Sequence, residues 1–227
     1  MPAWIPQPTD DGSFTFFSAE FGEAFHSQQG AKQEAFLKFA QATDLVEKAK
    51  QPQLCLLDVC YGLGYNTAAA LETIWSVNPD CFVTAYGLEL DASVPKAAVV
   101  PPVIDGWSEP VQAILRALAA DHQCLTLQLQ AKLLIGDARQ TIQSLQQASM
   151  QADAIFFRSL FATPLSPALD GGVFSAGGPL SGSDRKTSDL FAFSIGAGCD
   201  ASSWITDRHD SPESDPFAPR MVSGHRC

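Results

Sequence analysis

Four apolar runs, each followed by a glycine or an acidic residue, divide the middle of the chain. They span residues 54–57, 81–88, 125–135 and 152–157. Short apolar runs bounded by proline, glycine or acids are typical of buried strands. The stretches between them have helical spacing and end near Trp75, Ala120 and Ala148. Strands that alternate with helices predict an α/β fold with a parallel, doubly wound sheet, which binds ligands at the carboxyl ends of its strands.

The N-terminal part of the chain precedes this repeating pattern. Residues 1–12 contain three prolines and have no apolar period, so we expect a loose lead-in. Phe14 and Phe16 alternate with polar residues and predict a short edge hairpin. Apolar positions within residues 30–49 follow helical spacing, which predicts a helix that packs before the first core strand.

The turn after the first strand, D-V-C-Y-G-L-G-Y-N, predicts a nucleotide-cofactor site. Its glycines allow positive φ angles and close approach of a ligand, and the amides at the start of the next helix face the turn. The spacing D-x-x-x-G-x-G lacks the third glycine of the dinucleotide fingerprint, which favours S-adenosylmethionine over NAD. A purely structural turn is the alternative. The cofactor-binding residues predicted here are Asp58, Cys60, Gly62, Gly64 and Asn66.

Two acidic residues follow later strands and extend this prediction. Glu89 comes directly after the second strand, where it can accept hydrogen bonds from the two ribose hydroxyls. Asp137 follows the third strand, and with Ala138 it can form the adenine side of the site by accepting from the adenine amino group. The alternatives are a solvated loop acid for Glu89 and a helix N-cap for Asp137.

Composition limits the classes of partner. The formal charge of −11 disfavours nucleic acid unless a local basic patch exists. The chain has no apolar run of 18 or more residues and no signal-peptide pattern, so we expect a soluble, cytoplasmic protein. The cysteine spacings match no metal-ligand pattern, and we predict no metal site.

The chain resembles the methyltransferase half of the MnmC-type tRNA-modifying proteins, especially the stand-alone forms that lack the flavin oxidase half. The resemblance covers about residues 11–157. It rests on the strand-end Glu89 and on three segments, D-G-S-F-T-F-F-S-A-E-F-G-E-A-F-H-S-Q-Q-G-A-K-Q-E-A-F, L-D-V-C-Y-G-L-G-Y-N and L-L-I-G-D-A-R. The first segment is the specific one, because generic methyltransferases share only the glycine turn.

The resemblance implies a Rossmann-like methyltransferase that uses S-adenosylmethionine to methylate the aminomethyl nitrogen of a modified wobble uridine in tRNA. It also implies that Ser18, His26, Gly30 and Glu34 shape the cofactor pocket. Without the resemblance, His26 is a structural histidine and the nearby phenylalanines belong to the core. The other readings are a related methyltransferase with a different acceptor and a non-catalytic nucleotide-binding remnant.

The resemblance ends at Phe157. The family's D-x-F-[AS]-P acceptor-side motif is expected at position 158, where the chain reads R-S-L-F-A-T-P, so the catalytic residue is unknown. Residues 158–227 contain a single lysine and a single glutamate, and codons exist for residues 158–174 that, read one base later, encode D-P-F-S-P-P-H-C-P-Q-L-W. We interpret this segment as a frameshifted, disordered tail. We therefore expect an incomplete sheet with an uncovered fourth strand, weak cofactor binding and no methyl transfer.

Overall fold

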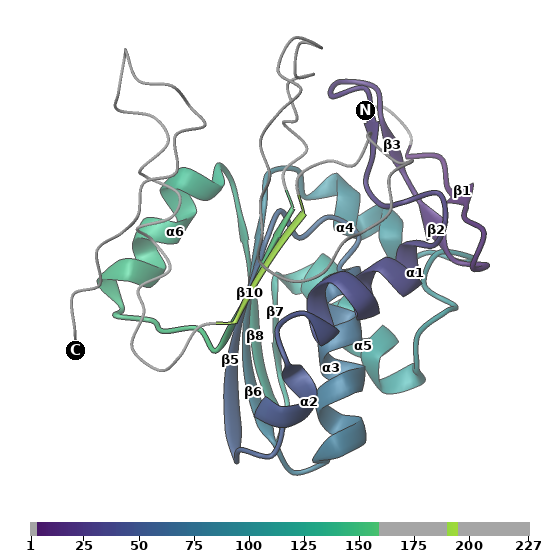
Figure 1. Ribbon diagram of the computed structural model, residues 1–227. Helices are drawn as coiled ribbons and strands as arrows, with labels where there is room; N and C mark the ends of the chain where they lie inside the picture. The colour runs from purple at the N-terminus through teal and green to yellow at the C-terminus, as the bar shows by residue number, and fades with distance from the viewer. Residues whose placement is uncertain (1–3, 159–189, 195–227) are drawn as a thin grey trace, which may run out of the picture.

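The computed structural model describes residues 4–158 and 190–194, which form an α/β structure around a six-stranded sheet (Figure 1). The strand order is β10-β9-β5-β6-β8-β7. In chain order these strands are β5 (Gln53–Val59), β6 (Phe82–Glu89), β7 (Gln123–Leu125), β8 (Leu129–Ile135), β9 (Ala154–Arg158) and β10 (Leu190–Ser194).

The centre of the sheet is parallel, as the alternation of strands and helices predicted. β5 pairs in parallel with β6 on one side and β9 on the other, and β6 pairs in parallel with β8. The register places Asp58 of β5 opposite Gly87 of β6. Since all four strands run the same way, Asp58, Glu89 and Gly136 lie at or near the carboxyl ends of their strands, at the same end of the sheet. The prediction of a Rossmann-like α/β sheet is confirmed.

Helices cover both faces of the sheet (Figure 1). One face is covered by α6 (Ala138–Gln147), whose Ile142 and Leu145 pack with Leu57, Leu88 and Ile155. The larger core lies on the opposite face. The helices on that side are α1 (Ala31–Glu34), the π-helix η1 (Ala35–Gln41), α2 (Leu45–Lys48), α3 (Tyr65–Val77), α4 (Ser93–Ala98) and α5 (Glu109–Asp121).

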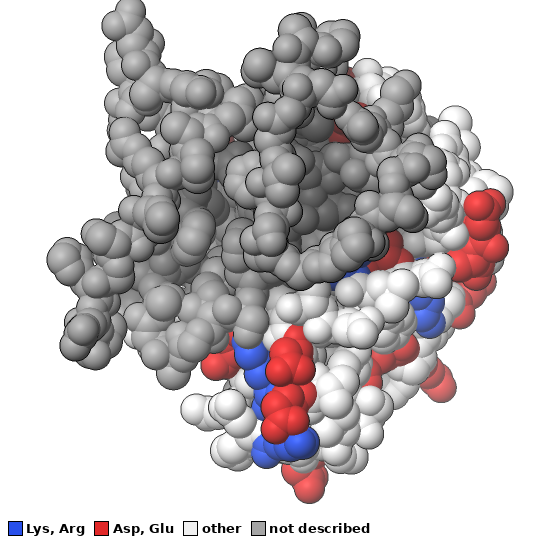
Figure 2. All heavy atoms as spheres, viewed as in Figure 1, with Lys and Arg blue, Asp and Glu red and all other residues white. Residues whose placement is uncertain are grey.

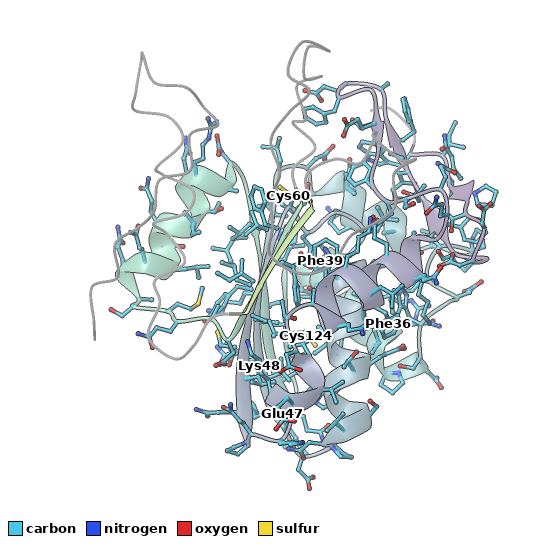
Figure 3. The ribbon with its side chains drawn as sticks, in the orientation of Figure 1. Phe36, Phe39, Glu47, Lys48, Cys60 and Cys124 are labelled. Atoms are coloured by element: carbon cyan, nitrogen blue, oxygen red, sulfur yellow. The ribbon has the colours of Figure 1, made fainter. Side chains whose placement is uncertain are left out.

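The leading helix predicted within residues 30–49 is present but interrupted. Its middle is the π-helix η1, and Asp44 has a φ of 57°, which ends that segment before α2 begins. Phe39 of η1, labelled in Figure 3, is fully buried. It meets Phe156 of β9 edge to face, with ring centroids 6.0 Å apart. The aromatic pair therefore ties the leading helix to the sheet.

The segment before residue 13 is not the loose lead-in that we expected. β1 (Gln7–Pro8) pairs with β2 (Phe14–Thr15), and β3 (Phe17–Ser18) pairs with β4 (Glu23–Ala24), so two small hairpins replace the single one predicted. Trp4 contacts the ring of Phe25 edge to face at 5.3 Å. The prediction for residues 4–12 is wrong because hairpin pairing and aromatic contacts hold them to the domain.

Two details between the second and fourth strands also differ from the prediction. The run 125–135 is not one strand, because a turn at Thr126 separates the antiparallel strands β7 and β8. The Thr126 backbone amide donates to the carbonyl of Leu129 at 2.8 Å and closes this turn. The proline-containing loop after residue 91 also holds the short helix α4.

The outer edge of β9 is covered, although we expected it to be uncovered. β10 pairs with it antiparallel, from Leu190 opposite Arg158 to Ser194 opposite Ala154. A part of the segment that we interpreted as a disordered tail thus supplies a strand. The other residues after Arg158 lie outside the described residues, and the frameshift and the domain boundary at residue 157 stay predictions.

Candidate cofactor site

The glycine turn lies at the carboxyl ends of the parallel strands and connects β5 to α3. Cys60, Gly62 and Gly64 have φ angles of 63°, 58° and 78°. The Tyr61 amide donates to the carbonyl of Leu88 at 2.9 Å, and the Gly64 amide donates to the carbonyl of Tyr61 at 2.9 Å. These bonds attach the turn to the neighbouring strand β6 and fix its path.

The ring of Tyr61 explains why glycine is needed in and beside this turn. A Cβ atom on Gly64 would lie 2.5 Å from the Tyr61 hydroxyl, and one on Gly87 would lie 2.7 Å from its Cδ2 atom. Phe25 closes the other side, because a Cβ on Gly62 would lie 3.1 Å from its Cδ1 atom. Side chains of the protein itself therefore pack against the backbone of the turn.

Asp58 is the most buried acid of the site, with 1 % exposure. Its Oδ2 accepts from the Thr67 hydroxyl at 2.8 Å, and its Oδ1 accepts from the Asn66 side-chain amide at 3.4 Å. Burial, with a smaller contribution from the charge of Glu89, raises the pKa of Asp58 to about 7 against the opposing effect of these hydrogen bonds. A large share of Asp58 is therefore protonated near neutral pH.

Glu89 closes the neighbouring strand and is also buried. Its Oε2 accepts from the Gly62 amide at 2.7 Å, and its Oε1 accepts from the Asp91 amide at 2.9 Å. Burial raises the pKa of Glu89, while these backbone hydrogen bonds lower it. The solvated-acid alternative is wrong, because Glu89 holds the glycine turn. A carboxylate has about four acceptor sites, so Glu89 keeps capacity for a ligand hydroxyl.

Asp58 and Glu89 bring two buried carboxyl groups to the same end of the sheet, where the charge of Glu89 acts on Asp58. None of the ion pairs within residues 4–158 includes either residue. Such a site stabilises positive charge and repels an anionic group such as a phosphate. This is the main electrostatic property of the candidate site.

Asp137 is the N-cap of α6, as its alternative reading predicted. Its side chain accepts from the Arg139 amide at 2.9 Å and pairs with the guanidinium of the same residue. The hydrogen bonds from Arg139 lower the pKa of Asp137 to about 2. Ala138 is the first residue of the helix. A role in adenine recognition stays a prediction for both residues.

The N-terminal segment supports the glycine turn from outside. The ring of His26 stacks on Tyr65, in the first turn of α3, with centroids 5.2 Å apart. Its Nδ1 lies 3.3 Å from Oε2 of Glu34, which also accepts from the Ser27 amide at 3.0 Å. His26 and Glu34 thus fix the hairpin against α3, which fits a positioning role.

Ser18 and Gly30 have different surroundings. Ser18 is buried in the second hairpin, where its hydroxyl accepts from the Phe21 amide at 3.4 Å. A Cβ on Gly30 would lie 2.7 Å from Oδ2 of Asp11. None of the contacts within the described residues joins either residue to the glycine turn, and their place in the cofactor pocket stays a prediction.

Replacing Glu34 by glutamine should lower the free energy of unfolding by about 1–3 kcal/mol, because an amide cannot replace both buried acceptor oxygens. Oε1 of Glu34 also accepts from Lys38 at 3.1 Å, so both oxygens are used. Urea unfolding measures the difference. Glu47→Gln is the matched control: Glu47 lies on the surface of α2 and should change stability by less than about 0.5 kcal/mol (Figure 3). Equal losses of unfolding free energy in the two variants would show that the buried hydrogen bonds of Glu34 do not stabilise the protein.

Sequence reasoning missed three supporting residues. Thr67 binds Asp58, Tyr61 packs against two glycines, and Asp11 accepts hydrogen bonds from Thr9, Ser13 and Gln33. A threonine in the first turn of an apolar helix was the available signal for Thr67. Burial alone would raise the pKa of Asp11, but its hydrogen bonds lower it to about 2.

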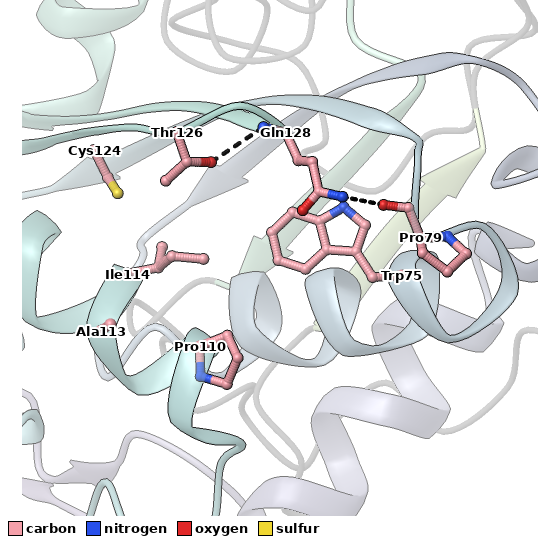
Figure 4. A pocket seen from close by; sticks show the side chains of 8 residues that line it. All are labelled: Trp75, Pro79, Pro110, Ala113, Ile114, Cys124, Thr126 and Gln128. Atoms are coloured by element: carbon pink, nitrogen blue, oxygen red, sulfur yellow. Dashed lines mark hydrogen bonds between the residues drawn. The ribbon is translucent and has the colours of Figure 1, made fainter.

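A separate groove lies at the amino ends of β6 and β8, at the opposite end of the strands from the glycine turn. Figure 4 shows the side chains that line it. Its volume is about 520 Å³. Trp75 and Gln128 each donate a side-chain hydrogen bond to a backbone carbonyl there. None of the predicted cofactor residues lines it. The lining residues are Trp75, Pro79, Pro110, Ala113, Ile114, Cys124, Thr126 and Gln128.

The described surface mixes both signs of charge. In Figure 2 basic side chains lie beside acidic ones, and Lys32, Lys38, Lys50 and Arg139 each form an ion pair with a carboxylate. Among the helices of the described part, none is long and apolar enough to cross a membrane. The described residues also hold no group of three or more His, Cys, Asp or Glu side chains that could bind a metal ion.

The parallel sheet, the glycine turn and the strand-end acids define a Rossmann-like methyltransferase fold. The structure is similar to that of MnmC2 from Aquifex aeolicus, with a TM-score of 0.55 and 31 % sequence identity. The match covers 68 % of this chain and 48 % of the Aquifex chain, so the present chain spans about half of that protein. This similarity supports an MnmC-like relationship.

The sequence match to a curated protein covers a shorter part of the chain. An uncharacterized protein of Methanocaldococcus jannaschii, MJ0670, is 40 % identical over 64 residues, which are 28 % of this chain and 17 % of that protein. No family model matches the chain.

Proposed function

We propose that this chain is the cofactor-binding part of an MnmC-like methyltransferase that uses S-adenosylmethionine. The observation that supports this best is the pair of buried carboxylates, Asp58 and Glu89, beside a turn of two positive-φ glycines. S-adenosylmethionine has a positive sulfonium and no phosphate, whereas NAD has a negatively charged pyrophosphate. The electrostatics of the site therefore favour the first cofactor.

In the proposed complex Glu89 accepts from the ribose hydroxyls, the glycine turn follows the methionine part, and Asp137 with Ala138 lies by the adenine. The acceptor is the aminomethyl nitrogen of a modified wobble uridine in tRNA. The nitrogen lone pair forms the new bond to the methyl carbon, the electron pair of the broken bond stays on sulfur, and one N–H proton leaves. The protein must align the two reactants and accept that proton.

The acceptor side of this reaction belongs to a segment that we propose is out of frame after Phe157. In this view the present chain binds S-adenosylmethionine weakly and transfers no methyl group. Sequencing the gene tests the frame directly: a nucleotide sequence in which no one-base shift restores D-P-F-S-P would disprove it. A related methyltransferase with another acceptor is the second candidate, supported by the charge of −11.

Calorimetric titration of the full chain with S-adenosylmethionine and with NAD tests the cofactor class. We expect heat only from S-adenosylmethionine, and tighter binding of NAD would contradict the proposal. A frame-restored protein should methylate tRNA that contains aminomethyluridine, and its Glu89→Ala variant should lose at least tenfold in cofactor affinity, which is about 1.4 kcal/mol. Glu109→Ala, an exposed acid at the start of α5, is the matched control.

A further inference from the structure

The side-chain oxygen of Asn66 is a buried acceptor to which no group of the described residues donates. Asn66 is 3 % exposed, and its amide is turned toward Asp58, to which its nitrogen donates. Within residues 4–158 its Oδ1 has no hydrogen-bond partner. If the amide is rotated by half a turn, Oδ1 faces Asp58, and only a protonated Asp58 can then donate to it. The surroundings of Asp58 thus suit both a neutral and an ionised carboxyl group.

The groups around Asp58 leave its negative charge uncompensated. From α3 it meets the uncharged side chains of Asn66 and Thr67, and from β6 the acid Glu89 acts on it. Tyr61 of the turn is buried nearby and stays protonated, because burial strongly raises its pKa. Across the described residues no lysine, arginine or histidine forms an ion pair with Asp58.

A cation bound beside Asp58 and Glu89 would shift Asp58 from its protonated to its ionised form. An opposite charge within about 4–6 Å favours the ionised form of a carboxyl group. Each unit by which a ligand lowers the pKa of Asp58 improves binding tenfold at high pH, because binding and proton release are linked.

We propose that Asp58 is a specificity-determining residue that loses a proton when S-adenosylmethionine binds, so that the site recognises the positive charge of the cofactor. This inference rests on the proposed function of the site. It predicts that affinity for S-adenosylmethionine rises with pH and levels off once Asp58 is ionised in the free protein. The pKa of about 7 for the free protein, which is due mainly to burial, makes this rise level off between about pH 7 and pH 8.

Calorimetry of the full chain with millimolar S-adenosylmethionine, in two buffers of different ionisation enthalpy, tests the proposal. We expect release of nearly one proton at pH 6 and of almost none at pH 8.5, with affinity rising about fivefold between pH 6 and pH 7 and about tenfold between pH 6 and pH 8.5. The neutral analogue 5′-methylthioadenosine should bind with no proton release. If 5′-methylthioadenosine released as many protons as S-adenosylmethionine, the proposal would be overturned.

Variants separate this effect from a general loss of structure. Asp58→Asn should bind S-adenosylmethionine with an affinity that does not change between pH 6 and pH 8.5. Asp80→Asn, an exposed acid before β6, should keep the pH dependence of the unmodified protein. Thr67→Val removes the hydroxyl that stabilises ionised Asp58, so it should move the rise in affinity to higher pH.

The outcomes distinguish two failures. Binding of S-adenosylmethionine with equal heats in both buffers and a flat pH profile overturns the proton linkage alone. Absence of binding at every pH, in this chain and in the frame-restored protein, overturns the proposed function and the linkage with it. An unchanged profile in Thr67→Val would also contradict the role of Asp58.

Discussion

Replacing Asp58 by asparagine should make the protein more stable at alkaline pH. The folded protein holds the pKa of Asp58 at about 7, above the ordinary value of 3.8, mainly because the group is buried. Between these two values the folded state binds more protons than the unfolded state, so stability falls as pH rises. At about 1.4 kcal/mol per unit, the loss by pH 8.5 is on the order of 4 kcal/mol. Asparagine has no proton to lose and also offers an N–H donor to Asn66.

Urea unfolding at pH 4.5 and pH 8.5 measures this effect. The two proteins should differ little at the lower pH, and Asp58→Asn should be the more stable by several kcal/mol at the higher one. Asp80→Asn removes a carboxylate from the surface and should leave the stability difference between the two pH values unchanged. Parallel pH profiles for Asp58→Asn and the unmodified protein would show that Asp58 titrates normally.

The sequence predicted the central sheet well because its signals are local. The four parallel strands are apolar runs with clear stops, and Asp58 and Glu89 mark two of those stops. The hairpin of β7 and β8 was missed because Leu125, Leu127 and Leu129 continue a strand-like alternation through a turn that has neither glycine nor proline. Leu127 is 98 % exposed, so this alternation does not mark a buried face.

The site was predictable only in part, because only some of its features have local signals in the sequence. Parallel strands bring their carboxyl ends together, which was enough to expect the glycine turn and Glu89 in one place. The stacking of His26 on Tyr65 depends on how a hairpin folds over α3, and no local pattern encodes it. The strand β10 comes from a segment with no recognisable period, so its pairing with β9 could not be predicted.

Replacing Gly64 by alanine should both destabilise the protein and disrupt the cofactor site. Its φ of 78° disfavours any other residue, and the added Cβ would lie 2.5 Å from the hydroxyl of Tyr61 and 3.1 Å from Cδ2 of Leu115. Strain of about 1–3 kcal/mol and overpacking of about 1–3 kcal/mol give an expected loss of roughly 2–6 kcal/mol. Because the Gly62 amide binds Glu89, movement of the turn should also weaken S-adenosylmethionine binding at least tenfold.

Thermal unfolding and calorimetric titration measure these two effects. Gly106→Ala is the matched control, since a Cβ there meets only Lys32 at 3.9 Å and the backbone φ is ordinary. Adding Tyr61→Phe removes the nearest clashing atom, so the double variant should be more stable than Gly64→Ala and should recover part of the affinity. A double-mutant cycle with no coupling between the two positions would show that the turn does not pack against Tyr61 in solution. In that case the turn would owe its need for glycine to the φ angle alone, and Gly64→Ala should cost no more than about 3 kcal/mol.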